Sequence, residues 1–395
     1  MDIRLSRRVN AVRPSPTLAV AARAQQLRRE GKDIVSLGAG EPDFDTPEYI
    51  KEAAIAAIHQ GFTKYTAVGG TPELKAAIIH KFQGDNGLSY RPDEILVSVG
   101  GKQSFFNLCQ ALLDAGDEVI IPAPYWVSYP DMVLLAEGRP VILPTDATQH
   151  FKITPEQLAA AITSATRLLV LNSPSNPSGV AYSRDELAAL GEVLRHHPQV
   201  LIASDDMYEK IRFHDEAFVN IANACPDLTS RCIVMNGVSK AYAMTGWRIG
   251  YCGGPRALIA AMTTVQSQST SNPTSIAQVA AQVALEGGDS AIHPMVHAFR
   301  RRHDYVYGRL HALPGVQILP SDGTFYSFPG FQGVMAAKGL SDDVAVADAL
   351  LEAGVAVVPG SAFGSPGHIR LSFATSDDNL RLALDRIAAF VHGAS

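Results

Sequence analysis

Between residues 95 and 253 the chain repeats one unit: a short aliphatic run, a polar turn and, in most cases, a stretch that suits a helix. This alternation is typical of a mostly parallel sheet with helices on both faces, because parallel neighbours need a crossover connection. Runs that are apolar throughout indicate strands covered on both sides. We therefore predict an α/β fold with a mostly parallel sheet of about seven strands, at residues 95–99, 118–122, 141–144, 168–172, 200–204, 233–236 and 249–252. The clearest predicted helices between them are 103–113, 127–137 and 184–195.

The pattern changes after residue 272, where a long helical stretch runs through 300–310 and the strand-like runs become shorter. This change predicts a second, smaller α+β unit. Its expected strands are 316–319, 325–328, 355–358 and 369–373, and its expected helices are 342–353 and 377–391. Near the N-terminus we expect a helix at 19–30 and a strand at 33–37.

Length and charge exclude several classes of protein. The chain has 395 residues, 47% of them hydrophobic, so it can bury a large core. This length predicts two domains instead of one. With 33 basic and 39 acidic residues the net charge is −6, and the absence of a basic stripe argues against nucleic acid as a partner. No apolar run reaches the roughly 18 residues of a membrane-spanning helix, and the first ten residues do not resemble a signal peptide. We expect a cytoplasmic protein with no membrane partner.

Metal and disulfide sites are not predicted. The four cysteines, at 109, 225, 232 and 252, are scattered without the short paired spacing of a zinc site or a disulfide framework. They suit small buried positions. We expect no metal.

Lys240 stands in the run Asn236-Gly237-Val238-Ser239-Lys240-Ala241-Tyr242, where its neighbours are small or apolar. Such surroundings disfavour the charged ammonium, and the neutral amine is the form that attacks a carbonyl group to give a Schiff base. Arg248, eight positions later, supplies a fixed cation that suits a phosphate. The alternative, a solvated surface lysine, does not fit these flanks. The run indicates a cofactor.

Polar residues follow four of the predicted strands at the point where each strand ends. They are Gly100 to Lys102, Ser175 to Gly179, Asp205 to Tyr208, and Lys240. Ligands of open α/β sheets bind beyond the carboxyl ends of the strands. We therefore expect these four elements to meet in one crevice.

The run from Asn236 to Gly250 resembles the pyridoxal-phosphate attachment site of class I aminotransferases. The resemblance covers nearly the whole chain and is closest to the bacterial aspartate aminotransferases, including the aspartate/prephenate aminotransferases. It implies a fold-type I transferase with an N-terminal arm and part of a small domain at 1–45, a large cofactor-binding domain at 46–290 and the rest of the small domain at 291–395. It also implies a homodimer with active sites at the interface, in which Tyr65 reaches the phosphate of the partner subunit.

The same resemblance implies the cofactor contacts. Lys240 would form the Schiff base and act as general base, and Asp205 would pair with the protonated pyridine nitrogen, because Ser204 to Glu209 matches an Asp-x-x-Tyr pattern. The neighbouring Asp206 suits a helix N-cap instead. Asn176 and Tyr208 would hydrogen-bond the phenolic oxygen of the ring.

Trp126 would cover the ring face, and its alternative is a tryptophan of the core. Gly100 and Gly101, which open a helix, would bind the phosphate together with Arg248, although a Gly-Gly pair also suits an ordinary strand-to-helix turn. Some family members have a phosphate-binding serine where this chain has Gly237. That contact would fall to Ser239 or to water.

Substrate contacts follow from the resemblance too. Arg370 would clamp the α-carboxylate, with Gly40 offering backbone and with Trp126 and Asn176 beside it; the alternative for Arg370 is a structural ion pair. Lys102 is both a cofactor-site residue and the expected partner of the distal carboxylate, helped by residues near Ser15 and Thr17. Its alternative is a surface residue at a helix start. Arg13, just before Pro-Ser, occupies a place that is linked to prephenate use.

Together these residues imply ping-pong transamination between L-aspartate and 2-oxoglutarate or oxaloacetate, with glutamate and prephenate or arogenate as further candidates. The same cofactor site leaves other outcomes open, namely an aromatic amino-acid aminotransferase, a C–S lyase and a cyclopropane-forming synthase. Lys102 favours a dicarboxylic substrate.

Overall fold

A seven-stranded sheet forms the centre of the computed structural model, which describes residues 3–12 and 14–393. The strand order is β2-β8-β7-β6-β5-β3-β4, and only β8 runs antiparallel to its neighbours. The predicted mostly parallel α/β sheet is confirmed. Its strands are β2 (Ile95–Ser98), β3 (Glu118–Pro122), β4 (Arg139–Leu143), β5 (Thr166–Asn172), β6 (Leu201–Asp205), β7 (Cys232–Gly237) and β8 (Gly250–Gly253).

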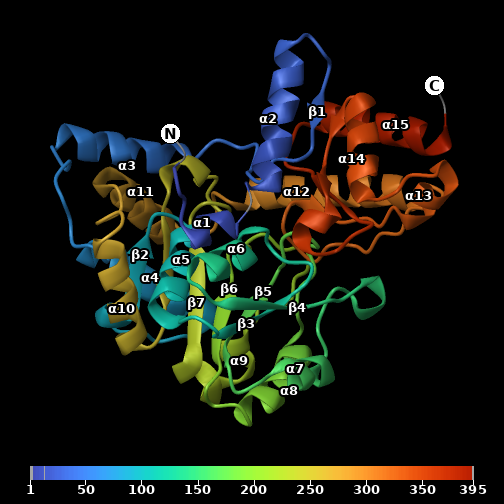
Figure 1. Cartoon of the computed structure of the whole chain (residues 1–395). Helices are drawn as coiled ribbons and strands as arrows, with labels where there is room; N and C mark the ends of the chain where they lie inside the picture. Colours follow the sequence, from blue (N-terminus) through green and yellow to red (C-terminus); the bar gives the residue numbers. More distant parts are fainter. Residues whose placement is uncertain (1–2, 13, 394–395) are drawn as a thin grey trace.

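Helices cover both faces of this sheet (Figure 1). Alternate side chains of β5 enter different cores: Leu168 packs with residues of α5, α6 and α10, whereas Leu169 packs with residues of α4, α8 and α11. Burial on both faces explains why central strands such as β5 are mainly apolar. The helices of this part are α3 (Glu48–His59), α4 (Pro72–Asn86), α5 (Gly101–Leu112), α6 (Ser128–Leu135), α7 (Pro155–Ala161), α8 (Arg184–Arg195), α9 (Ile221–Ala224), α10 (Arg256–Ser267) and α11 (Ser275–Glu286).

Local signals set the helix ends where they are strong. At the start of α8 the Ser183 hydroxyl accepts a hydrogen bond from the amide of Glu186 at 3.2 Å, and the Glu186 carboxylate accepts one from the amide of Ser183 at 2.7 Å. This capping box satisfies two amide groups that the first turn leaves unpaired. The predicted bounds of α8 match the structure.

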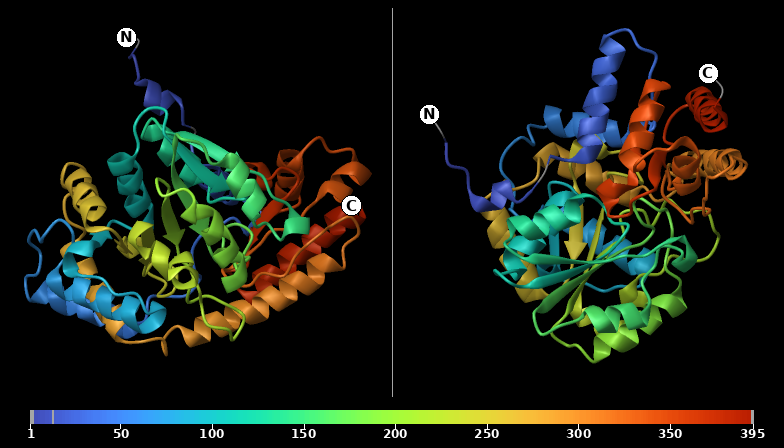
Figure 2. Two further views of the ribbon diagram at one scale, coloured as in Figure 1. Left: turned by 90° about the horizontal axis from the view of Figure 1, so that it is seen from below. Right: turned by 45° about the vertical axis from the view of Figure 1, so that its right-hand side comes forward.

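The C-terminal unit is a smaller α+β assembly, as predicted. The long helix α12 reaches from the helices beside the large sheet to α15 and β9 (Figure 2). The N-terminal strand β1 pairs in parallel with β10, so the start of the chain packs onto this unit. The elements are α1 (Arg7–Asn10), α2 (Pro16–Arg29), β1 (Val35–Ser36), α12 (His293–His311), β9 (Tyr326–Ser327), α13 (Gln332–Lys338), α14 (Asp343–Glu352), β10 (Val355–Ala356), β11 (Val358–Pro359), β12 (Ile369–Ser372) and α15 (Asp377–His392).

The strand predicted at 316–319 is wrong. Only Gln317 pairs, through two hydrogen bonds with Gly330, and the bridge does not extend into a ladder. Pro320 and Pro329 flank the bridge and lack the amide hydrogen that a longer ladder needs.

No helix among the described residues is long and apolar enough to cross a membrane.

Candidate active site

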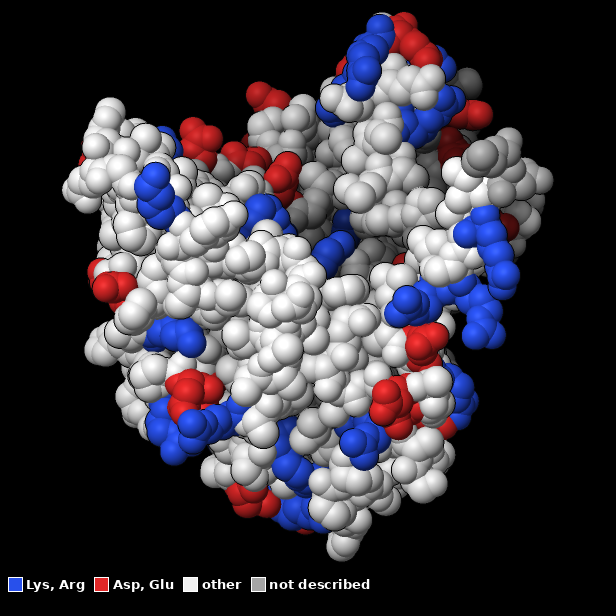
Figure 3. Space-filling model, turned by 60° about the vertical axis from the view of Figure 1, so that its left-hand side comes forward, with Lys and Arg blue, Asp and Glu red and all other residues white. Residues whose placement is uncertain are grey.

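A cavity of about 450 Å³ lies at the carboxyl ends of β5, β6 and β7, where it is also bordered by α2 and by the segment that follows β1. On one face the molecule is deeply hollowed, with Lys and Arg side chains in the hollow (Figure 3). The cavity brings together eleven residues that the sequence singles out: Gly40, Gly101, Lys102, Trp126, Asn176, Asp205, Tyr208, Ser239, Lys240, Arg248 and Arg370. The four predicted elements therefore do meet in one crevice.

Lys240 follows β7 and extends into this cavity. Its Nζ donates a hydrogen bond to the Gly40 carbonyl at 2.5 Å. Burial lowers the pKa of the Lys240 amine to about 8, and the Arg370 cation acts in the same direction. A useful fraction of the amine is therefore neutral near pH 7 to 8. This is the state that a lysine needs in order to attack a carbonyl group or to accept a proton.

Asp205, the last residue of β6, presents its carboxylate to the cavity. The carboxylate accepts hydrogen bonds from the Tyr129 hydroxyl and, at 3.2 Å, from the amide of Met207. Burial raises the pKa of Asp205, although both hydrogen bonds and the Lys240 charge oppose the rise. A cation placed beside this carboxylate would keep it ionised.

Asp206 points the other way and does not line the cavity. Its carboxylate accepts hydrogen bonds from the Ser204 hydroxyl at 2.7 Å and from Asn220 Nδ2 at 2.6 Å. The prediction that Asp206 is a helix N-cap is wrong, because the residues directly after Asp206 form a turn and no helix begins there.

The start of α5 and Arg248 form a cradle that suits an anion. No side chain caps α5, so the first amide groups of the helix are open to a ligand. Gly100, with φ of +85°, is required here, since a Cβ would come within 2.3 Å of Arg248 Nη2. Arg248 is held by a 2.8 Å hydrogen bond from its Nη1 to the Thr245 carbonyl. A phosphate could therefore meet backbone amides and a guanidinium together.

Ser239 is buried and lines the same cavity. The structure also explains Gly237, where some family members have serine. A Cβ at this position would come within 3.1 Å of both Gly250 Cα and the Ile249 carbonyl. A side chain here would therefore require the backbone of β8 to move away by a few tenths of an ångström.

Arg370 stands on β12 and is 2% exposed. Its Nη1 donates to Asn176 Oδ1 at 3.0 Å and its Nη2 to the Gly38 carbonyl at 2.9 Å, while its Nε has no hydrogen-bond partner in the part of the chain that the structure describes. No carboxylate of the described residues forms an ion pair with it, so a structural ion pair is the wrong interpretation. A buried guanidinium with an unused donor suits an anionic ligand.

Lys102 and Trp126 form a second wall of the cavity. The Lys102 ammonium lies 5.1 Å from the centre of the Trp126 ring. Partial burial and the Arg248 cation lower the pKa of Lys102. Thr17 of α2 borders the cavity too, and its hydroxyl lies 2.9 Å from that of Ser15. Trp126 is therefore half-buried beside a ligand space, not enclosed in the core.

Two predicted residues lie elsewhere. Tyr65 is 91% exposed and does not line the cavity of its own chain. Arg13 lies outside the described residues.

The sequence interpretation missed several residues of the site. Asn172 joins two parts of it, since its Nδ2 donates to the Asp205 carbonyl at 2.9 Å and its Oδ1 accepts from the Asn176 amide at 2.8 Å. Tyr129 holds Asp205, and Tyr326 and Glu41 line the cavity. Tyr129 lies three positions after Trp126, near the start of the predicted helix 127–137, and this closeness along the chain to a predicted site residue is the signal that could have identified it.

The family model for aminotransferases of class I and II matches residues 32–387. The chain belongs to this family. It is 60% identical to an aspartate/prephenate aminotransferase of Nitrosomonas europaea, over 98% of this chain and 100% of that protein. It is 50% identical to an aspartate aminotransferase of Geobacillus stearothermophilus, over 98% of this chain and 99% of that protein.

Solved aminotransferases have the same fold. The aspartate aminotransferase of Rhizobium meliloti superposes with a TM-score of 0.95 at 51% identity, with 99% of both chains covered. The enzyme of Thermus thermophilus, solved with maleate, gives a TM-score of 0.93 at 46% identity, over 98% of this chain and 100% of that one. The seven-stranded sheet and the smaller unit of this aminotransferase are those of a fold-type I transferase.

Proposed function

We propose that this aminotransferase uses pyridoxal phosphate to move the amino group of L-aspartate to 2-oxoglutarate. The observation that carries the proposal is the meeting of Lys240, Asp205 and Arg370 in one cavity. The names of the relatives support aspartate as the donor. Maleate, present in the Thermus thermophilus structure, is a dicarboxylate like aspartate.

The cavity has residues that suit both the phosphate and the pyridine ring of the cofactor. The open amides of Gly101 and Lys102, with Arg248 and Ser239, would hold the phosphate. Asp205 would pair with the pyridine nitrogen, and Asn176 and Tyr208 would bind the phenolic oxygen. Trp126 would cover the ring. Pyridoxal phosphate, when bound, supplies an aldehyde that condenses with amines and a ring that accepts the electron pair released at the substrate Cα.

The side chains of the protein would then orient the substrate and move one proton. Arg370 would bind the α-carboxylate through two parallel hydrogen bonds, with the Gly40 backbone beside it. Lys240 Nζ, whose pKa is about 8, would take the proton from Cα and hold it. Because the donor product must leave before the acceptor enters, the kinetics would be ping-pong.

Lys102 would select for a distal carboxylate. Replacing Lys102 by leucine is expected to lower kcat/KM for aspartate by about 10- to 100-fold, because the free energy of one hydrogen bond to a charged group is lost. For phenylalanine, which has no distal carboxylate, kcat/KM is expected to change by less than about threefold. Steady-state kinetics with both donors measures this. Equal losses with the two donors would contradict the assignment.

Glutamate and prephenate would share the Lys102 and Arg370 contacts, with Arg13 as a further candidate for prephenate.

The lowered pKa of Lys240 predicts a pH dependence of cofactor uptake. Only the neutral amine reacts, so the rate at which the apoprotein captures pyridoxal phosphate is expected to rise about tenfold per pH unit below pH 8 and to level off above it. Stopped-flow absorbance measures the rate, with N-acetyl-lysine, whose amine keeps its ordinary pKa, as the reference. If the capture rate of the protein instead rises with pH up to pH 10, as the rate of N-acetyl-lysine does, the pKa of Lys240 is not lowered.

We also propose a homodimer in which the exposed Tyr65 reaches the phosphate of the partner subunit. The proposed domains are 46–290, which would hold the cofactor, and a small domain made of 1–45 and 291–395. We place the protein in the cytoplasm, whose reducing conditions suit its four buried free thiols. Sedimentation velocity tests the dimer.

An absorbance spectrum tests the function as a whole. The purified protein with pyridoxal phosphate is expected to show a visible band that L-aspartate removes and 2-oxoglutarate restores. A band that aspartate leaves unchanged would favour an aromatic amino-acid aminotransferase. Pyruvate released from cystathionine without an added keto acid would favour a C–S lyase.

A further inference from the structure

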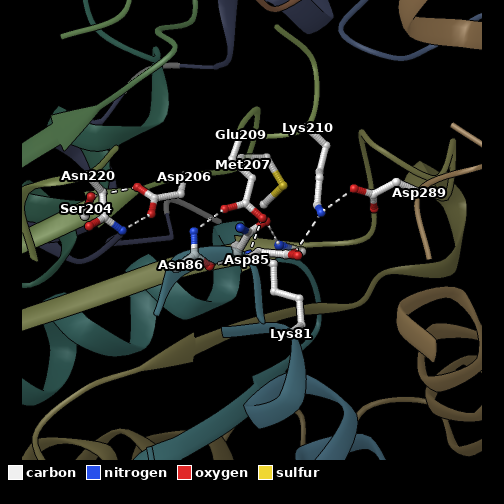
Figure 4. A network of polar contacts seen from close by, with 12 residues as sticks. Lys81, Asp85, Asn86, Ser204, Asp206, Met207, Glu209, Lys210, Asn220 and Asp289 are labelled. Atoms are coloured by element: carbon white, nitrogen blue, oxygen red, sulfur yellow. Dashed lines mark hydrogen bonds and ion pairs between the residues drawn. The ribbon is translucent and has the colours of Figure 1, made fainter. Parts of the chain in front are cut away.

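The turn that follows β6 has two faces. Asp205 and Tyr208 line the active-site cavity, and Asp206 and Glu209 do not. The Asp206 carboxylate instead contacts Asn220, and the Glu209 carboxylate contacts Asn86 (Figure 4). The amide of Glu209 donates to the Asp206 carbonyl at 3.0 Å, so the turn is closed by its own backbone. Any movement of the hidden face therefore also moves the face that borders the cavity.

Lys81, on α4, holds the hidden face through a buried ion pair with Glu209. The two side chains are only 5% and 4% exposed. Lys81 Nζ also donates to Asn86 Oδ1 at 2.7 Å, and Asn86 Nδ2 donates to Glu209 Oε2 at 2.9 Å. The three side chains form a closed ring of polar contacts (Figure 4). A buried ion pair is often no more stabilising than apolar residues of the same volume, so what such a ring adds is one fixed arrangement of its groups.

Asp206 fixes the other end of the turn. It is 1% exposed, and the hydrogen bonds from Ser204 and Asn220 hold its carboxylate. Its amide donates to the Met235 carbonyl at 2.9 Å. Burial and the neighbouring Glu209 charge raise the pKa of Asp206 to about 7. Loss of the Lys81 cation would leave Glu209 without its buried ion pair beside this second carboxyl, an arrangement that favours movement of the turn.

On the cavity side the two side chains of the turn are held differently. Asp205 is the last residue of β6 and pairs with Asn172 on β5 and Met235 on β7, and its carboxylate accepts hydrogen bonds from Tyr129 and from an amide of the turn. The Tyr208 hydroxyl has one long hydrogen bond, 3.3 Å, to the Tyr326 hydroxyl. The position of Tyr208 relative to Asp205 therefore depends most on how the turn is held from behind.

We propose that Lys81 is a positioning residue of the cofactor site, which acts through Asn86 and Glu209 to fix the turn that presents Asp205 and Tyr208. Lys81 does not line the cavity, so it acts only through other residues. The inference rests on the proposed function, because the cofactor contacts of Asp205 and Tyr208 belong to it.

The test replaces Lys81 by methionine in the full chain, Lys81→Met, and titrates the apoprotein with pyridoxal phosphate. The dissociation constant of the cofactor is expected to rise at least about tenfold. The pH midpoint of the visible band is expected to move by at least about half a unit, because Asp205 and Tyr208 no longer meet the ring in the same way. Lys81→Arg keeps the charge and is expected to restore most of both values.

Lys152→Met is the matched control, because the Lys152 ammonium is also largely buried but pairs at 2.9 Å with Glu186, at the start of α8, and not with a residue of the turn. It is expected to change the dissociation constant by less than about twofold. An effect as large as that of Lys81→Met would overturn the proposal, since loss of a paired lysine elsewhere in the chain would then suffice.

If Lys81→Met does not fold, Asn86→Ala opens the ring and leaves the ion pair; a smaller rise of the dissociation constant in the same direction is expected. A lower melting temperature of the apoprotein, with the dissociation constant and the pH midpoint at wild-type values in the folded variants, would show a purely structural role and overturn the proposal. Wild-type protein without a visible band would instead refute the proposed function on which it rests.

Discussion

Replacing Lys240 by alanine is expected to lower kcat for aspartate transamination by at least about 10⁴-fold, since one side chain supplies both the amine that holds the cofactor and the base that takes the Cα proton. Its lowered pKa and its position in the cavity suit both tasks. No other lysine has this position: Lys102, the other lysine of the cavity among the described residues, follows β2 at the start of α5.

Single-turnover kinetics with the cofactor-loaded variant measures this effect apart from cofactor affinity. Lys51→Ala, at a partly exposed ion pair with Glu48, is the control and is expected to keep wild-type kcat. A Lys240→Ala variant that retains a tenth of the wild-type kcat would refute the assignment of the base.

Replacing Arg370 by leucine is expected to lower kcat/KM for aspartate by about 10³-fold, because a buried charge that meets a carboxylate contributes several kcal/mol and water does not replace it there. Arg370 is suited to this contact by its burial and its unused Nε. One N–H of Nη1 and one N–H of Nη2 are fixed by Asn176 and Gly38, so the guanidinium is already oriented and keeps donors for a ligand.

The dissociation constant of maleate, measured by its effect on the visible band, gives a readout that does not depend on turnover. In the Arg370→Leu variant this dissociation constant is expected to rise as kcat/KM for aspartate falls. Arg370→Lys keeps the charge but not the planar fork, and it is expected to recover only part of the loss. An unchanged affinity for maleate in Arg370→Leu would show that another group binds the carboxylate.

The sequence predicted the large sheet well because each strand carries its own signal. A strand that is buried on both faces is apolar throughout, and Ser183 with Glu186 marks a helix start without help from distant residues. The prediction failed where such signals were weak or depended on a partner segment. The strand expected at 316–319 is one case, since flanking prolines limit its pairing to a single bridge.

Much of the candidate site could also be predicted, because the carboxyl ends of parallel strands gather at one edge of a sheet. Asp205 and Lys240 follow neighbouring strands, β6 and β7, and both line the cavity. The direction of Asp206 could not be predicted in this way, because a side chain in a turn follows neither the strand nor the helix period. Its partner Asn220 lies beyond the turn.

The sequence by itself determined the α/β class, the strands of the large sheet and the choice of Lys240, because these depend on residues that are close together along the chain. Only the tertiary structure decided which partners Arg370 and Lys81 have. Asn176 and Gly38 lie 194 and 332 positions from Arg370, and Glu209 lies far along the chain from Lys81. Contacts of this kind form only when the packed core brings the elements together, and burial then gives each charge its pKa and its strength.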